Sequence, residues 1–106
     1  MSKKLKPIHP GQQLREQFMV PLGLSSDALA RALNVTPVRI NEIVRERRRI
    51  SADMALRLAR FFDTSHQFWL NLQANYEVHC AEDAAGPAIA RIKPWSGTTE
   101  RGADVA

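Results

Sequence analysis

The segment SSDALARALNVTPVRINEIVR, residues 25–45, decides the fold of this 106-residue chain. Its pattern predicts two short helices, residues 26–33 and about 37–45, joined by a tight turn. The turn begins at Asn34, a residue type that tolerates the left-handed backbone region in which many helices end. Two helices this close in sequence must pack against each other.

The second helix has a clear start and two distinct faces. Thr36 offers a hydroxyl N-cap, and Pro37 stands at the first helical position, where a missing N–H costs nothing. The branched aliphatic residues recur at i, i+3 and i+4 and point inward, while the opposite face carries hydrogen-bonding groups. The inward residues are Ile40, Ile43 and Val44; the outward residues are Val38, Asn41, Glu42 and Arg45.

These positions resemble the helix-turn-helix of phage repressors. Apolar residues stand where that motif packs its two helices together, and Ala30 stands where the helices approach too closely for a larger side chain. The apolar positions are Leu29, Leu33, Val35, Ile40 and Ile43. The resemblance implies that the second helix enters the DNA major groove.

The outward face predicts base contacts. Asn41 suits adenine, Arg45 suits guanine, and Val38 suits a thymine methyl group. Glu42 either accepts from cytosine or pairs with Arg39 or Arg45. We expect phosphate or flanking contacts from Ser25, Ser26, Thr36, Pro37, Arg39, Arg47, Arg48 and Arg49.

Charge is unevenly distributed along the chain. Residues 1–50 hold ten Lys and Arg against four Asp and Glu, whereas residues 51–106 hold five against seven. A basic half that contains the motif is typical of a nucleic-acid binder, although a merely solvated basic face is the alternative. A single cysteine, the lack of an apolar membrane-spanning run and the lack of a secretory signal favour the cytoplasm.

The remaining sequence predicts an all-α, five-helix domain over residues 9–85. A loose basic arm, residues 1–8, precedes a first helix of about residues 11–20 that ends at Pro21-Leu22-Gly23-Leu24. Ser51 and Ser65 cap the fourth and fifth helices, and the fifth runs to about residue 81. Residues 86–106 form a tail, in which 88–92 is a possible short strand and 96–106 is expected to be disordered.

The sequence indicates neither a metal site nor an enzyme. His79 and Cys80 are adjacent, but neighbouring helical residues point about 100° apart and cannot easily share a metal ion. No nucleophile motif surrounds a serine, and there is no glycine-rich phosphate loop. We therefore expect no cofactor.

Taken together, HPGQQLREQF, PLGLS, ALARALNV, RINEIV, ISADMALRLARFF and FWLNLQANYE resemble the HigA family of antitoxins over about residues 8–79. The family usually has a small Asn-Gly-Lys-type turn after the recognition helix, whereas this chain has Arg45-Glu46-Arg47. The resemblance implies a lambda-repressor-like homodimer that binds a palindromic operator and represses its own operon. It also implies a partner, a HigB-type toxin that cleaves mRNA.

Two questions stay open at this point. The chain could instead be a stand-alone regulator without a toxin, or an interaction module that uses its basic face for an acidic protein. The dimer contact is expected in the less charged half, at Trp69, Leu72, Tyr76, Ile89 and Ile92. The alternative is that this stripe is wholly core and that two copies meet only on DNA.

Overall fold

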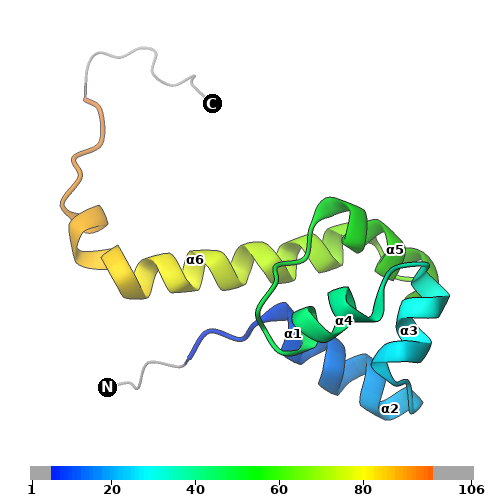
Figure 1. Cartoon of the computed structure of the whole chain (residues 1–106). Coiled ribbons are helices and arrows are strands. Elements are labelled where there is room, and N and C mark those ends of the chain that lie inside the picture. The colour runs from blue at the N-terminus through cyan, green and yellow to red at the C-terminus, as the bar shows by residue number, and fades with distance from the viewer. Residues whose placement is uncertain (1–5, 97–106) are drawn as a thin grey trace.

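The computed structural model describes residues 6–96, and within this range the chain is helical without any strand (Figure 1). The elements are α1 (Pro10–Gln13), η1 (Leu14–Met19), α2 (Val20–Leu22), α3 (Ser26–Leu33), α4 (Pro37–Val44), α5 (Ala52–Phe62) and α6 (His66–Ala90). Because α1, η1 and α2 follow one another without a break, the described chain has five separate helical stretches. The expected five-helix, all-α fold is confirmed.

The first helical stretch is longer than the sequence predicts, and Pro21 lies within it. In a regular α-helix the proline ring would clash with the carbonyl four residues back. Here the six residues of η1 wind as a π-helix, and the amide of Val20 bonds to the carbonyl of Arg15, five residues back. This wider winding accommodates the proline, and the stretch ends only at Gly23, in the left-handed region at φ 66°.

The two motif helices form as predicted. Ser25 Oγ accepts from the amide of Ala28 at 3.0 Å and begins α3, and Asn34 ends it at φ 61°. Thr36 Oγ1 accepts from the amide of Arg39 at 3.3 Å and begins α4. The boundaries follow from capping chemistry that the sequence states locally.

One hydrophobic core joins all five stretches. Its buried members are Leu14, Met19, Leu29, Ala30, Leu33, Ile40, Ile43, Ile50, Met54, Ala55, Leu58, Ala59 and Trp69. Trp69 is fully buried beside the ring of Phe18, with centroids 4.9 Å apart, and its indole N–H donates to Thr64 Oγ1 at 2.8 Å. The core therefore fixes α4 on its inner side and leaves the outer side available.

The last helix departs most from expectation. α6 continues to Ala90, so the predicted end near residue 81 and the possible strand at 88–92 are both wrong. Ala85 has non-helical angles of φ −139° and ψ 15°, which kinks the helix two residues before Pro87. The kink makes Pro87 an early residue of a new helical turn, where proline is tolerated. Figure 1 shows the C-terminal part of α6 projecting away from the other helices, while its N-terminal part packs on the core through Trp69.

Two predicted segments fall partly outside the described residues. The basic arm was predicted for residues 1–8, of which 6–8 are described and lie outside any helix. The disorder was predicted for residues 96–106, of which only Ser96 is described; it is exposed and belongs to no helix.

Candidate nucleic-acid interface

The helix α4 is held in place by an unusually close backbone contact. A Cβ atom added to Gly11 would lie 1.8 Å from the carbonyl oxygen of Ile43, so only glycine fits against this end of α4. Arg15 donates to the carbonyl of Val44 in the last turn and also lies 3.8 Å from Glu46. The first helical stretch thus holds the C-terminal end of α4 in place.

The outward face of α4 forms a shallow hollow of about 280 Å³. The structure brings all four predicted base-reading residues together there, with Arg47 beside them: Val38, Asn41, Glu42, Arg45 and Arg47 line it. Val38 is 60% exposed although it is apolar. The guanidinium groups of Arg45 and Arg47 make no hydrogen bond or ion pair with any residue from 6 to 96, so their N–H donors remain available for a ligand.

Within the chain, Glu42 pairs with neither of the two arginines predicted for it. Its Oε1 accepts from Arg48 Nε at 2.7 Å and lies 2.7 Å from Arg48 Nη2, instead of meeting Arg39 or Arg45. Arg48 reaches it because the chain reverses directly after α4. The carboxylate therefore orients Arg48 at the border of the hollow.

The reversal after α4 depends on a residue in the left-handed region. The amide of Glu46 bonds to the carbonyl of Ile43 at 2.9 Å, and that of Arg47 bonds to Glu42 at 2.8 Å, which completes a Schellman motif. Glu46 occupies the position that usually needs glycine, at φ 65°. The Arg45-Glu46-Arg47 sequence thus makes the same kind of tight turn that a glycine would make more easily.

Arg49 is tied to α6 through a polar network. It donates to Glu77 Oε2 from Nη2 at 2.9 Å and from Nε at 3.1 Å, and Gln73 donates to the same oxygen at 2.8 Å. Gln73 Oε1 in turn accepts from the amide of Ile50 at 2.8 Å. The Arg49 guanidinium, followed by the Gln73 amide, lowers the pKa of Glu77. Of the three consecutive arginines, Arg47 alone has a side chain without a partner among the described residues.

Four of the predicted flanking residues lie at the N-terminal ends of α3 and α4. Ser25 and Thr36 use their hydroxyls as caps, and Pro37 is the first residue of α4. Ser26, the first residue of α3, is half-buried. Arg39 is also half-buried, and its Nη2 lies 3.6 Å from Asp53 Oδ2.

Asp53 joins Arg39 of α4 to Arg57 of α5. Arg57 Nε donates to Asp53 Oδ2 at 2.9 Å, and this hydrogen bond is the main cause of the lowered pKa of Asp53. Arg57 Nη1 also donates to the carbonyl of Leu33 at 2.8 Å, at the end of α3. The cluster braces the two helices of the motif against α5.

The residues expected at a dimer contact divide into three kinds. Trp69 is wholly buried in its own domain, because it fills the space between the first helical stretch and α5, so its assignment to an interface is wrong. Leu72 packs on the core, and the ring of Tyr76 meets the edge of His9 at 4.8 Å. Ile89 and Ile92 are 51% and 69% exposed on the distal part of α6 and just beyond it.

Several residues that shape this site were not singled out by the sequence. Gly11, Arg15 and Arg57 act through contacts far apart in the chain, which no local pattern reveals. Gln73 could have been found from the sequence. It stands on the buried stripe of α6 that also holds Trp69, and a polar residue there needs a hydrogen-bonding partner.

Two further features are absent from the described part of the chain. Residues 6–96 contain no group of three or more His, Cys, Asp or Glu side chains able to hold a metal ion. No helix in that range is both long and apolar enough to cross a membrane.

Comparison with known proteins identifies the family. A helix-turn-helix family model matches residues 13–69. Virulence-associated protein I of Dichelobacter nodosus is 56% identical over 79 residues, which cover 74% of this chain and 73% of that protein. The solved structure of Pseudomonas aeruginosa antitoxin HigA with the higBA promoter is 53% identical, has a TM-score of 0.80, and is covered over 98% of its length by 84% of this chain.

A second solved structure is antitoxin GraA in complex with its operator. It is 44% identical to this chain, with a TM-score of 0.80, and the match covers 92% of this chain and 99% of GraA. The residues that the helix-turn-helix family model matches include α3, α4 and the turn between them. The chain belongs to the helix-turn-helix proteins and, among them, to the HigA family of antitoxins.

Proposed function

We propose that the protein is a sequence-specific transcriptional repressor that binds a palindromic operator as a homodimer in the cytoplasm. One observation carries the proposal: α4 and its C-cap Arg45 present an exposed face whose hydrogen-bonding side chains surround a hollow, and the Arg45 guanidinium has no partner among residues 6–96. Support comes from two relatives of about half identity solved with promoter or operator DNA.

The mechanism that fits this face is occupancy. α4 enters the major groove with Asn41 and Arg45 directed at base edges, and Val38 supplies an apolar contact to a thymine methyl group. Arg47 contacts phosphate, and the N-terminal ends of α3 and α4 direct backbone amides towards the DNA backbone. Bound protein blocks transcription without a chemical step, so no catalytic residue is assigned.

A binding titration tests this proposal. The full chain is titrated against the DNA upstream of its own reading frame and against a scrambled duplex of equal length, at one fixed salt concentration. We expect binding to the upstream DNA to be at least about a thousandfold tighter, the lower bound for specific binding by such proteins. Equal affinity for the two duplexes would contradict sequence-specific recognition.

We also infer that the protein neutralises a HigB-type, mRNA-cleaving toxin encoded beside it. This inference rests on family membership. The test is co-expression with the neighbouring reading frame. Relief of growth arrest and a stable complex of the two chains are expected, and their absence would leave a stand-alone regulator.

A further inference from the structure

Glu77 on α6 is held in place by a residue of the core. Gln73 is buried, and its Oε1 accepts from the amide of Ile50 at 2.8 Å. Because that oxygen is occupied, the amide nitrogen of Gln73 points the other way and donates to Glu77 Oε2 at 2.8 Å. The Glu77 carboxylate is therefore positioned from within the domain, independently of Arg49.

Arg49 is the exposed partner in this network. Its side chain is 61% exposed, against 48% for Glu77, and both of its hydrogen bonds go to the same carboxylate oxygen. A guanidinium carries more N–H donors than these two bonds use. The remaining donors of Arg49 have no acceptor among residues 6–96, in a side chain that solvent already reaches.

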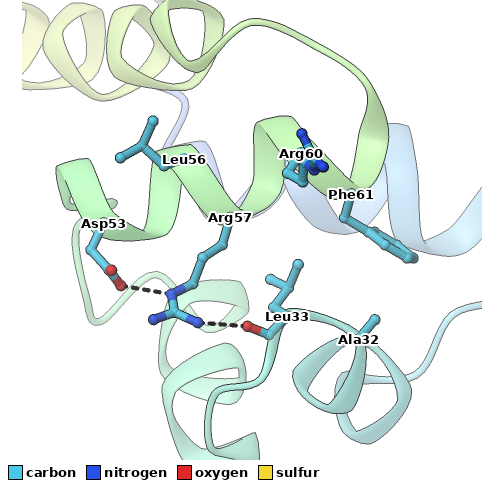
Figure 2. A pocket seen from close by; sticks show the side chains of 7 residues that line it. All are labelled: Ala32, Leu33, Asp53, Leu56, Arg57, Arg60 and Phe61. Carbon is cyan, nitrogen blue, oxygen red and sulfur yellow. Dashed lines mark hydrogen bonds and ion pairs between the residues drawn. The ribbon is translucent and has the colours of Figure 1, made fainter.

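A second arginine–carboxylate pair differs in what depends on it. Figure 2 shows Arg57 beside the hollow between α3 and α5, bonded to Asp53 and also to the carbonyl of Leu33 at the end of α3. If Arg57 moved, this helix-end carbonyl would lose its donor. No backbone group among residues 6–96 accepts from the Arg49 guanidinium, so Arg49 can change partners without such a loss.

Arg49 also belongs to the arginine run that is expected to contact phosphate. Arg47 lines the hollow of α4, and Arg48 at its border is held by Glu42. A guanidinium binds carboxylate and phosphate through the same planar set of donors. Glu77 therefore offers Arg49, within the chain, the kind of contact that a DNA phosphate would offer it.

We propose that Glu77 is an internal competitor of DNA phosphate, which holds Arg49 in the free protein and releases it to the DNA backbone in the complex. This rests on the proposed DNA-binding function and adds a positioning residue that sets its strength. Because an exposed ion pair is weak, the competition lowers the affinity without preventing binding. Because phosphate contacts carry no sequence information, it lowers the affinity for operator and random duplex alike.

A double-mutant cycle on DNA binding by the full chain tests the competition. Glu77→Gln removes the charge but keeps the size of the side chain and an oxygen that can accept from Gln73. We expect it to bind a scrambled duplex about two- to fivefold more tightly, which corresponds to the strength of an exposed ion pair. In an Arg49→Ala background the same substitution should have no effect. Equal tightening in both backgrounds would mean that Glu77 only repels DNA at a distance, and would overturn the proposal.

Glu82→Gln is the matched control for net charge. Glu82 is exposed on the same helix and makes no ion pair with residues 6–96. Its substitution removes the same charge and should leave the affinity for DNA unchanged. A tightening as large as that of Glu77→Gln would assign the effect to net charge and overturn the proposal.

The salt dependence gives a readout that a purely structural role of Glu77 would not move. In the Glu77→Gln background, removing Arg49 should flatten the slope of log K against log salt by the full value for one phosphate contact, about 0.9. In the wild type, where Glu77 competes, the same removal should flatten it by less. An equal change in both backgrounds would contradict the competition.

NMR of the wild-type chain gives a measure that does not depend on how the Glu77 variant folds. The Nε–H resonance of Arg49, assigned by its absence from Arg49→Ala, should move when duplex saturates the protein, because its acceptor changes. A resonance that stays in place while those of α4 shift would overturn this inference and leave the repressor intact. Equal affinity for operator and scrambled duplex would contradict the repressor alone, and a chain that binds neither duplex would contradict both.

Discussion

The inner side of α4 is packed against the rest of the chain, whereas its outer side carries side chains that are exposed to solvent. On the inner side, Ile40 and Ile43 are fully buried and the Ile43 carbonyl rests on Gly11. On the outer side, Val38 is exposed and the Arg45 guanidinium has no partner among residues 6–96. The helix with its C-cap Arg45 thus serves stability on one side and the proposed recognition on the other, and substitutions should separate the two.

The largest effect is expected on the inner side, from Gly11→Ala. The added methyl group would collide with a backbone carbonyl, which cannot swing aside as a side chain can. We expect unfolding in urea to show a loss of about 3 kcal/mol, the upper part of the usual range for overpacking.

Gly86→Ala is the matched control, since its Cβ would meet open space within α6. A helical glycine replaced by alanine normally gains roughly 0.5–1 kcal/mol. The two glycines should therefore respond with opposite signs, and a stabilising Gly11→Ala would show that the close approach to α4 is not real.

Arg45→Ala tests the outer side. The guanidinium is exposed at the hollow and is suited to guanine, so its loss should cost roughly 1–3 kcal/mol on the operator and less on random DNA. Unfolding in urea should be unchanged. Arg91→Ala, which removes the same charge just past the end of α6, is the control. Equal losses on both duplexes would reduce Arg45 to a phosphate contact.

A smaller difference is expected within the arginine run. The Arg47 guanidinium has no partner among the described residues, whereas that of Arg49 is held by Glu77. Removing one phosphate contact flattens the slope of log K against log salt by about 0.9. Arg47→Ala should show this change and Arg49→Ala less of it.

The triple alanine variant of Arg47, Arg48 and Arg49 gives the largest change in this slope that the arginine run can cause. Its slope should fall by at most about 3, with base preference retained. An unchanged slope would assign all three arginines to the fold or to a protein partner.

The sequence predictions succeeded where the deciding interactions join residues that are close together in the chain. Ser25, Thr36 and Asn34 act on backbone groups within five residues, so the bounds of α3 and α4 were predictable. The outward grouping of the residues proposed to read bases followed from helical periodicity alone.

Predictions failed where distant or compensating structure decides the outcome. Pro21 and Pro87 both suggested helix ends, but the π-helical winding of η1 and the kink at Ala85 accommodate them. The partner of Arg49 comes from α6, 28 positions along the chain. Nothing near the arginines in the sequence could have revealed that pairing.

A substitution in the turn directly after α4 should stabilise the folded protein modestly. Glu46 adopts φ 65°, which costs a residue with a side chain roughly 1–2 kcal/mol relative to glycine. Glu46→Gly should therefore raise the free energy of unfolding, by about 1 kcal/mol after loss of the exposed contact with Arg15, which is worth little. A loss of stability would mean that the Arg15 pair outweighs the backbone strain.

The smallest expected effect is a pH dependence of the free energy of unfolding, which arises from His9 beside the contact between Gly11 and α4. His9 caps α1 by accepting from the amide of Gly11 at Nδ1, 2.8 Å away, which requires the neutral ring. Burial lowers the pKa of His9 from 6.5, and the nearby Glu46 opposes that shift only in part.

Because the unfolded chain then binds the proton more readily than the folded chain, the contribution of His9 is complete above pH 6.5 and is lost as the pH falls towards the lower folded value. Urea unfolding of the wild type and of His9→Asn across pH 5 to 8 measures it. Asparagine also caps helices but does not titrate in this range, and His66 and His79 are present in both proteins. The stability difference between wild type and variant should shift against the wild type on acidification. A difference that is constant with pH would mean that His9 contributes through packing on Tyr76 alone.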